Sequence, residues 1–123
     1  KVLKLAFANN MYLALGKFVL QKKSKLFTFL KMSKQIEKQA LVSHGVVEVK
    51  LIGTSLNTFY TATLWETEID MKNFAHSGEH MEAIKVAQSL AKEMSFVFYE
   101  ADKIPSKKKI DKILKEHPAV RNY

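Results

Sequence analysis

Residues 58–80 read TFYTATLWETEIDMKNFAHSGEH, and they hold the strongest strand and helix signals of the chain. Its first part alternates between two mainly apolar faces and predicts a strand over Thr58–Glu66. Thr67-x-x-Asp70 is a capping-box pattern, so we expect a helix to begin at Thr67. Ser77-Gly78 should interrupt this helix, which restarts at Glu79.

Hydrophobic periodicity in the rest of the chain predicts the other elements. The predicted strands are Met11–Leu20, Val46–Ile52 and Ser95–Ala101, and the predicted helices run from a Ser24 cap to about Ser43, from Glu79 to Met94 and over residues 106–116. The order is βαββαβ with an extra C-terminal helix, which predicts an α+β, ferredoxin-like domain with a four-stranded antiparallel sheet. We expect one domain over residues 1–123, with residues 1–10 as an extension ahead of Met11.

One face of this predicted sheet lacks a cover from the two main helices. A second copy of the chain could shield it, which predicts a homodimer in which two sheets close a barrel. The C-terminal helix could also dock, through Ile110, Ile113 and Leu114.

Composition excludes several classes of site. The 123 residues contain no cysteine, which rules out disulfides, zinc-thiolate centres and a cysteine nucleophile and is compatible with a reducing cytoplasm. No apolar run reaches the roughly 18 residues of a membrane helix. The sequence contains no phosphate-cradling glycine loop and no metal-ligand spacing among its histidines. We therefore expect a cytoplasmic protein without a transmembrane segment.

Charge is unevenly distributed along the chain. The net charge of +8 combines +8 in residues 1–50, −4 in residues 51–101 and +4 in the remainder. A lysine-rich surface can attract an anionic membrane or nucleic acid, or can be a solvated face. The basic residues are lysines with one arginine, which argues against nucleic-acid recognition.

A family resemblance comes from two segments and a later tripeptide. The segment 59–66 ends in Leu-Trp-Glu, the segment 71–80 contains Met-x-x-Phe and Ser-Gly-x-His, and Ile-Pro-Ser follows at 104–106. This pattern resembles the antibiotic-biosynthesis-monooxygenase-like proteins of the dimeric α+β barrel superfamily, in a branch related to spheroidene monooxygenase. In that branch a Trp follows a Leu-Pro-Ser segment, where this chain has Lys107.

The resemblance implies a homodimer with a cavity between sheet and helices. Members of the family include cofactor-independent oxygenases of aromatic polyketides, haem degraders, haem-dependent carotenoid oxygenases and proteins without known activity. The resemblance therefore leaves open an oxidoreductase that takes a hydrophobic or aromatic substrate or haem, or a non-catalytic ligand-binding or stress-related domain. Haem degradation is disfavoured, because the positions aligned with the family's Trp and His hold Phe74 and Ile84.

His80 is the candidate catalytic residue. It lies on the apolar stripe of its helix and in the first helical turn, where the helix dipole disfavours the imidazolium. A neutral, inward imidazole could act as a general base or, if haem is bound, as the iron ligand. It could equally hydrogen-bond a backbone carbonyl and fix the Ser77-Gly78 break. The other expected ligand-binding residues are Trp65, Phe74, Tyr60, Met71 and Ile84. Trp65 and Met71 could instead belong to the core, and Tyr60 could pack at the sheet of a dimer.

Overall fold

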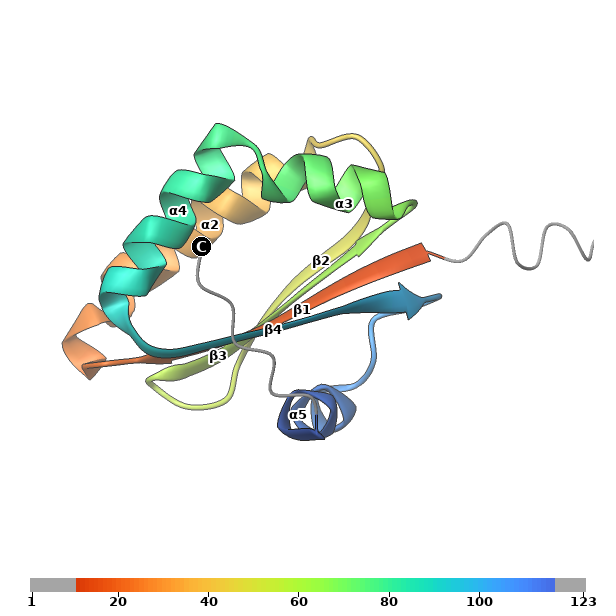
Figure 1. The fold of residues 1–123 in the computed structure, drawn as a ribbon. Helices are drawn as coiled ribbons and strands as arrows, with labels where there is room; N and C mark the ends of the chain where they lie inside the picture. The colour runs from red at the N-terminus through yellow and green to blue at the C-terminus, as the bar shows by residue number, and fades with distance from the viewer. Residues whose placement is uncertain (1–10, 117–123) are drawn as a thin grey trace, which may run out of the picture.

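The computed structural model describes residues 11–116, which form an α+β domain around one sheet (Figure 1). The strands are β1 (Met11–Leu20), β2 (Val46–Gly53), β3 (Thr58–Trp65) and β4 (Ala91–Ala101). They pair antiparallel in the order β2-β3-β1-β4. Among the described residues, no helix is long and apolar enough to cross a bilayer.

Helices cover both faces of the sheet. On one face lie α2 (Leu26–Leu41), α3 (Glu68–Ala75) and α4 (Gly78–Leu90), with the short 3-10 helix η1 (Lys23–Lys25) leading into α2; α5 (Lys107–Glu116) lies on the other (Figure 1). The connection through α2 joins β1 to β2, which run parallel on either side of β3. The connection through α3 and α4 joins β3 to β4 on either side of β1, so both are split βαβ units. The ferredoxin-like fold, the antiparallel sheet and the extra C-terminal helix predicted from the sequence are confirmed, and residues 1–10 lie outside the described part.

The far face of the sheet, which the sequence led us to expect bare, has a cover within the chain. Ile110 and Leu114 of α5 are buried, together with Ile104, against Leu13 and Leu15 of β1. The predicted docking of the last helix is therefore observed, and it supplies the cover that the prediction assigned to a second copy. The sheet of one chain is open and does not close into a barrel by itself.

Two predicted boundaries differ from the structure. The helix expected to reach Met94 ends at Leu90, because β4 pairs with β1 from Ala91 onward. Met94 is buried within β4, and its apolar character suits a helix as well as a strand. Ser24 does not cap α2; it lies within η1, and Lys25 at the N-cap position makes no side-chain cap hydrogen bond.

The turn before β2 depends on Gly45. Its φ of +82° lies in the left-handed region, and a Cβ at this position would lie 2.1 Å from Oδ2 of Asp70. The absence of a side chain lets Asp70 accept a hydrogen bond from His44 Nδ1 at 2.8 Å. This contact joins the α2–β2 turn to α3.

Candidate functional site

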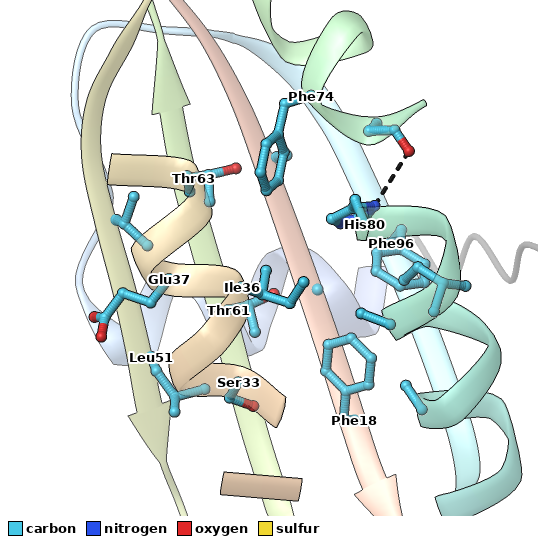
Figure 2. Close-up of a pocket in the computed structure, with 18 of the residues that line it drawn as sticks. Phe18, Ser33, Ile36, Glu37, Leu51, Thr61, Thr63, Phe74, His80 and Phe96 are labelled. Carbon is cyan, nitrogen blue, oxygen red and sulfur yellow. Dashed lines mark hydrogen bonds between the residues drawn. The ribbon is translucent and has the colours of Figure 1, made fainter. Parts of the chain in front are cut away.

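A cavity of about 130 Å³ lies between the sheet and the helices α2, α3 and α4 (Figure 2). It separates two clusters of the helix-side core, one around Phe18 and Phe29 and the other around Trp65 and Phe74. An apolar protein cavity of comparable volume holds one benzene molecule. The cavity therefore has room for one aromatic ring.

Small residues leave this space open. The face of β1 that points toward the helices carries Ala14 and Gly16 between larger side chains, and α4 contributes Ala83 and Ala87 above them. A Cβ on Gly16 would lie 2.6 Å from Oγ1 of Thr61, so the floor of the cavity cannot accept even a methyl group without movement. A glycine inside a strand often marks such a close approach.

His80 projects from the first turn of α4 toward the cavity (Figure 2). Its Nδ1 lies 3.2 Å from the carbonyl oxygen of Ala75, at the end of α3. A carbonyl can only accept, so Nδ1 carries the proton and donates it, and the neutral ring keeps its lone pair on Nε2. The ring also packs against Phe74, with 4.8 Å between ring centroids.

The break between α3 and α4 holds His80 in place. Ser77 caps α4 by accepting from the backbone N–H of His80 at 3.3 Å, and its hydroxyl donates to the carbonyl of Phe74 at 2.8 Å. Nε2 of Gln39 in α2 donates to the same hydroxyl at 2.9 Å. Contacts from two other elements therefore fix the position of the imidazole.

Burial lowers the pKa of His80 below its ordinary value of 6.5, and the nearby His76 lowers it further, while the hydrogen bond to Ala75 opposes the shift in part. Near neutral pH the ring is therefore uncharged, and Nε2 can accept a proton or a hydrogen bond. The hydrogen bond to Ala75 fits the interpretation of His80 as the residue that fixes the break, and a role of His80 toward a ligand stays a prediction.

Of the expected ligand-binding residues, Phe74, Met71 and Ile84 line the cavity together with His80. Trp65 does not line it. The indole is fully buried beneath Phe74, with 5.1 Å between the ring centroids, and Nε1 donates to Oγ1 of Thr63 at 2.9 Å. Trp65 supports the cavity wall from behind.

Tyr60 lies on the opposite face of the sheet, so its expected place in the cavity is wrong. Its hydroxyl donates to Asp111 of α5, which also pairs with Lys115 at 3.0 Å. Burial, and next the contact with Asp111, raises the pKa of Tyr60 to about 12. This side chain anchors α5 to the sheet.

Several residues of the lining were not predicted from the sequence. Thr61 and Thr63 of β3 bring the hydroxyl groups on the sheet side, and Phe96 of β4 and Ile36 of α2 form apolar walls (Figure 2). The strand alternation indicated the face on which Thr61 and Thr63 lie, but it carried no sign of a cavity. Among residues 11–116, no group of three or more His, Asp or Glu side chains could hold a metal ion.

Similarity to known proteins rests on structure alone. The sequence matches no family model and no curated protein. The structure is similar to a conserved protein from Methanosarcina mazei (TM-score 0.71, 14% identity, covering 80% of this chain and 99% of the other). It is equally similar to a Nitrosomonas europaea protein assigned to the antibiotic biosynthesis monooxygenases (TM-score 0.71, 13% identity, 80% and 96% covered).

A third similar structure is SnoaB, a cofactor-independent oxygenase from Streptomyces nogalater (TM-score 0.65, 9% identity, 80% of this chain and 99% of the other covered). Identities this low show the fold and not the activity. The structural neighbours do not test the expected relation to the spheroidene monooxygenase branch, which stays a prediction. The chain has the fold of the antibiotic biosynthesis monooxygenase-like proteins.

Proposed function

We propose that this protein binds a single-ring phenol or quinol in the cavity and acts on it as a small, cofactor-independent monooxygenase, with His80 as the general base. The observation that carries the proposal is the imidazole of His80 in a mainly apolar lining, whose Nδ1 donates to the carbonyl of Ala75 and whose Nε2 is therefore the nitrogen that can accept a proton. Apolar pockets with a few convergent polar groups are typical ligand sites, and a perturbed pKa there favours a chemical role.

The chemistry begins with proton transfer. Nε2 of His80 takes the proton of the substrate hydroxyl, and the resulting phenolate is richer in electrons and reacts more readily with dioxygen than the phenol does. The imidazolium stays hydrogen-bonded to Ala75 and faces the new anion across a cavity of low dielectric, where their attraction is stronger than in water. Phe74, Met71 and Ile84 would hold the ring and keep water away.

Haem is not part of the proposal. A porphyrin carries four pyrrole rings around its metal, whereas the cavity has room for about one ring. His80 could offer Nε2 to iron only if the helices moved apart. Titrating the protein with haem, with His80→Ala beside it, tests this directly, because a Soret shift that depends on His80 would contradict a haem-free site.

Oxygen consumption with hydroquinones as substrates tests the catalytic role. His80→Gln should lower the rate about 10²- to 10⁴-fold, the usual contribution of a general base. The matched control is His76→Gln, at an exposed histidine four residues earlier, which should leave the rate within about two-fold of the parent. A rate that His80→Gln leaves unchanged would contradict the assignment.

The second candidate is a non-catalytic domain that holds an apolar ligand. The hydrogen bond from His80 to Ala75 favours it, because that contact alone explains why a histidine stands at this position. The two candidates differ in one observable. A hydroquinone that binds in the cavity without oxygen uptake supports the non-catalytic domain.

The homodimer also remains a proposal. The half-buried residues Val97 and Tyr99 lie on the sheet face that α5 covers, so a pair formed through this face must either displace α5 or pack around it. Sedimentation of the whole chain decides between one copy and two. A cytoplasmic location stays a prediction that rests on the absence of cysteine.

A further inference from the structure

Three chain segments meet at one end of the sheet, away from His80. The backbone N–H of Leu20, at the end of β1, donates to the carbonyl of Asn57 in the β2–β3 turn at 2.7 Å. The next residue, Gln21, donates to the carbonyl of Leu90 at the end of α4 at 2.9 Å. Its side chain reaches the carbonyl of Ala91 at 3.2 Å. Figure 1 shows the start of α2, the β2–β3 turn and the α4–β4 junction at this same end.

The charge at this end is positive. No Asp or Glu occurs in residues 18–36, 54–65 or 83–92, which include all three segments. Glu93 directly follows the last of these segments, and its carboxylate pairs with Lys17 at 3.3 Å. Four exposed lysines lie in or beside these segments: Lys22, Lys23, Lys25 and Lys92. We call these lysines, together with Phe27 and Leu56, the basic end.

Two large apolar side chains are exposed beside these lysines. Phe27, in the first turn of α2, is 82% exposed, and Leu56, at the tip of the β2–β3 turn, is 58% exposed. Single exposed apolar residues are common on soluble proteins. An aromatic side chain at a helix start and an aliphatic side chain in a turn, both exposed among lysines, form a more specific pattern.

We propose that the basic end docks on an anionic lipid bilayer. Phe27 and Leu56 would enter the boundary between headgroups and acyl chains, and the four lysines would face the lipid phosphates. The acids Glu66, Glu68 and Asp70 follow β3 at the opposite end of the sheet, so the charge distribution orients the molecule with the basic end toward the membrane. This surface is independent of the ligand cavity.

Nucleic acid is the other anionic surface to consider. Its recognition usually enlists arginine forks, whereas the basic end holds lysines. An exposed aliphatic residue such as Leu56 gains little beside phosphates in water, but it gains by burial in lipid. The combination therefore favours a bilayer over a nucleic acid.

Co-sedimentation with vesicles of equal parts phosphatidylglycerol and phosphatidylcholine tests the proposal. We expect the whole chain to bind these vesicles and not pure phosphatidylcholine. Phe27→Gln should weaken binding about ten-fold, as expected for the loss of partial burial of one aromatic side chain. Lys23→Ala/Lys25→Ala should weaken it about thirty-fold, at about five-fold for each lysine near the surface.

Matched variants elsewhere separate this surface from general charge. Ile69 is 68% exposed in α3, at the opposite end, so Ile69→Gln is the control for Phe27→Gln. Lys108 and Lys109 are exposed on α5, so Lys108→Ala/Lys109→Ala is the control for the lysine pair. We expect each control to change binding by no more than about two-fold. Ile69 lies away from the bilayer in the proposed orientation, and the charges of Lys108 and Lys109 are screened beyond the Debye length.

Three results would overturn the proposal. The first is no preference for the anionic vesicles. The second is equal weakening by the α5 and basic-end lysine variants, which would mean attraction by net charge alone. The third is tight binding of a single-stranded oligonucleotide that Phe27→Gln weakens as strongly as it weakens vesicle binding, which would identify base stacking as the role of Phe27.

Discussion

His80 uses its two nitrogens for different purposes, and this division underlies the candidate site. Nδ1 satisfies the carbonyl of Ala75, one of the last-turn acceptors of α3 that the helix itself leaves unpaired. Nε2 is then the nitrogen that can accept a hydrogen bond or a proton. The apolar stripe of α4 allowed the inward position of His80 to be predicted, but the carbonyl partner depends on where α3 ends, which the sequence leaves uncertain by a residue or two.

The pKa of His80 gives a signed prediction for stability. The folded protein holds this pKa below 6.5, so as pH falls below about 6.5 the unfolded chain takes up a proton that the folded chain refuses. The stability of the parent minus that of His80→Gln should therefore decrease as the pH is lowered from neutral. Urea unfolding of both proteins across this pH range measures the difference.

His44 supplies a control of opposite sign. Its hydrogen bond to Asp70, and next the carboxylate charge, raise the pKa of His44, so its contribution is present at low pH and is lost as pH rises. The stability of the parent minus that of His44→Gln should increase as the pH is lowered. If the stability differences for His80→Gln and His44→Gln changed with pH in the same direction, the direction of one of the two pKa shifts would be wrong.

Tyr60 shows where residue-scale prediction failed. Successive side chains of a strand point to opposite faces, and Tyr60 and Trp65 are separated by an odd number of positions. They therefore cannot share a face in a regular strand, and β3 is regular throughout its pairing with β1. The alternation of a strand is by itself enough to place Tyr60 and Trp65 on opposite faces, and expecting both in one cavity overlooked it.

Filling the cavity should abolish ligand binding and leave the fold intact. Ala83 lines the cavity from α4, so the three additional carbon atoms of Ala83→Leu would occupy the space that a ligand needs. Phenol, detected through the fluorescence of Trp65 behind Phe74, should bind to the parent and at least about ten-fold more weakly to the variant. The variant's unfolding midpoint should stay within a few degrees of the parent's.

At the scale of elements, the sequence determined the types well and one boundary poorly. The ladder with β1 decides where β4 begins, and this long-range pairing overrides the helical spacing that runs on to Met94. The broken helix was easier to predict, because Thr67 and Ser77 each cap a segment by accepting from a backbone N–H three residues later. A helix cap can be predicted from a few neighbouring residues, whereas the pairing of β4 with β1 depends on residues far apart in the sequence.

The docking of α5 gives an element-scale prediction. Ile110 is fully buried between α5 and the sheet, so Ile110→Ala should lower the free energy of unfolding by about 2–5 kcal/mol. Lys109→Ala, at the exposed neighbouring position, should change it by less than about 0.5 kcal/mol. Urea denaturation measures both. A loss below about 1 kcal/mol for Ile110→Ala would mean that α5 contributes little to the fold in solution.

At the scale of the whole molecule, periodicity predicted the fold, whereas only the family resemblance led us to expect a cavity between sheet and helices. The order of alternating and helical segments predicted a four-stranded antiparallel sheet, which the structure confirms. The cavity arises where Ala14, Gly16 and Ala83, small residues from distant parts of the chain, meet between two layers. No local pattern reports such a coincidence, because it depends on the packing of helix against sheet.

A titration with phenol, followed by NMR of the histidine rings, tests whether the cavity binds a ligand beside His80. We expect the ring resonances of His80 and the indole N–H of Trp65 to shift with one saturable curve, while the rings of His76 and His44 stay in place. Equal shifts at all three histidines, or no saturable shift at His80, would contradict a ligand site at that imidazole.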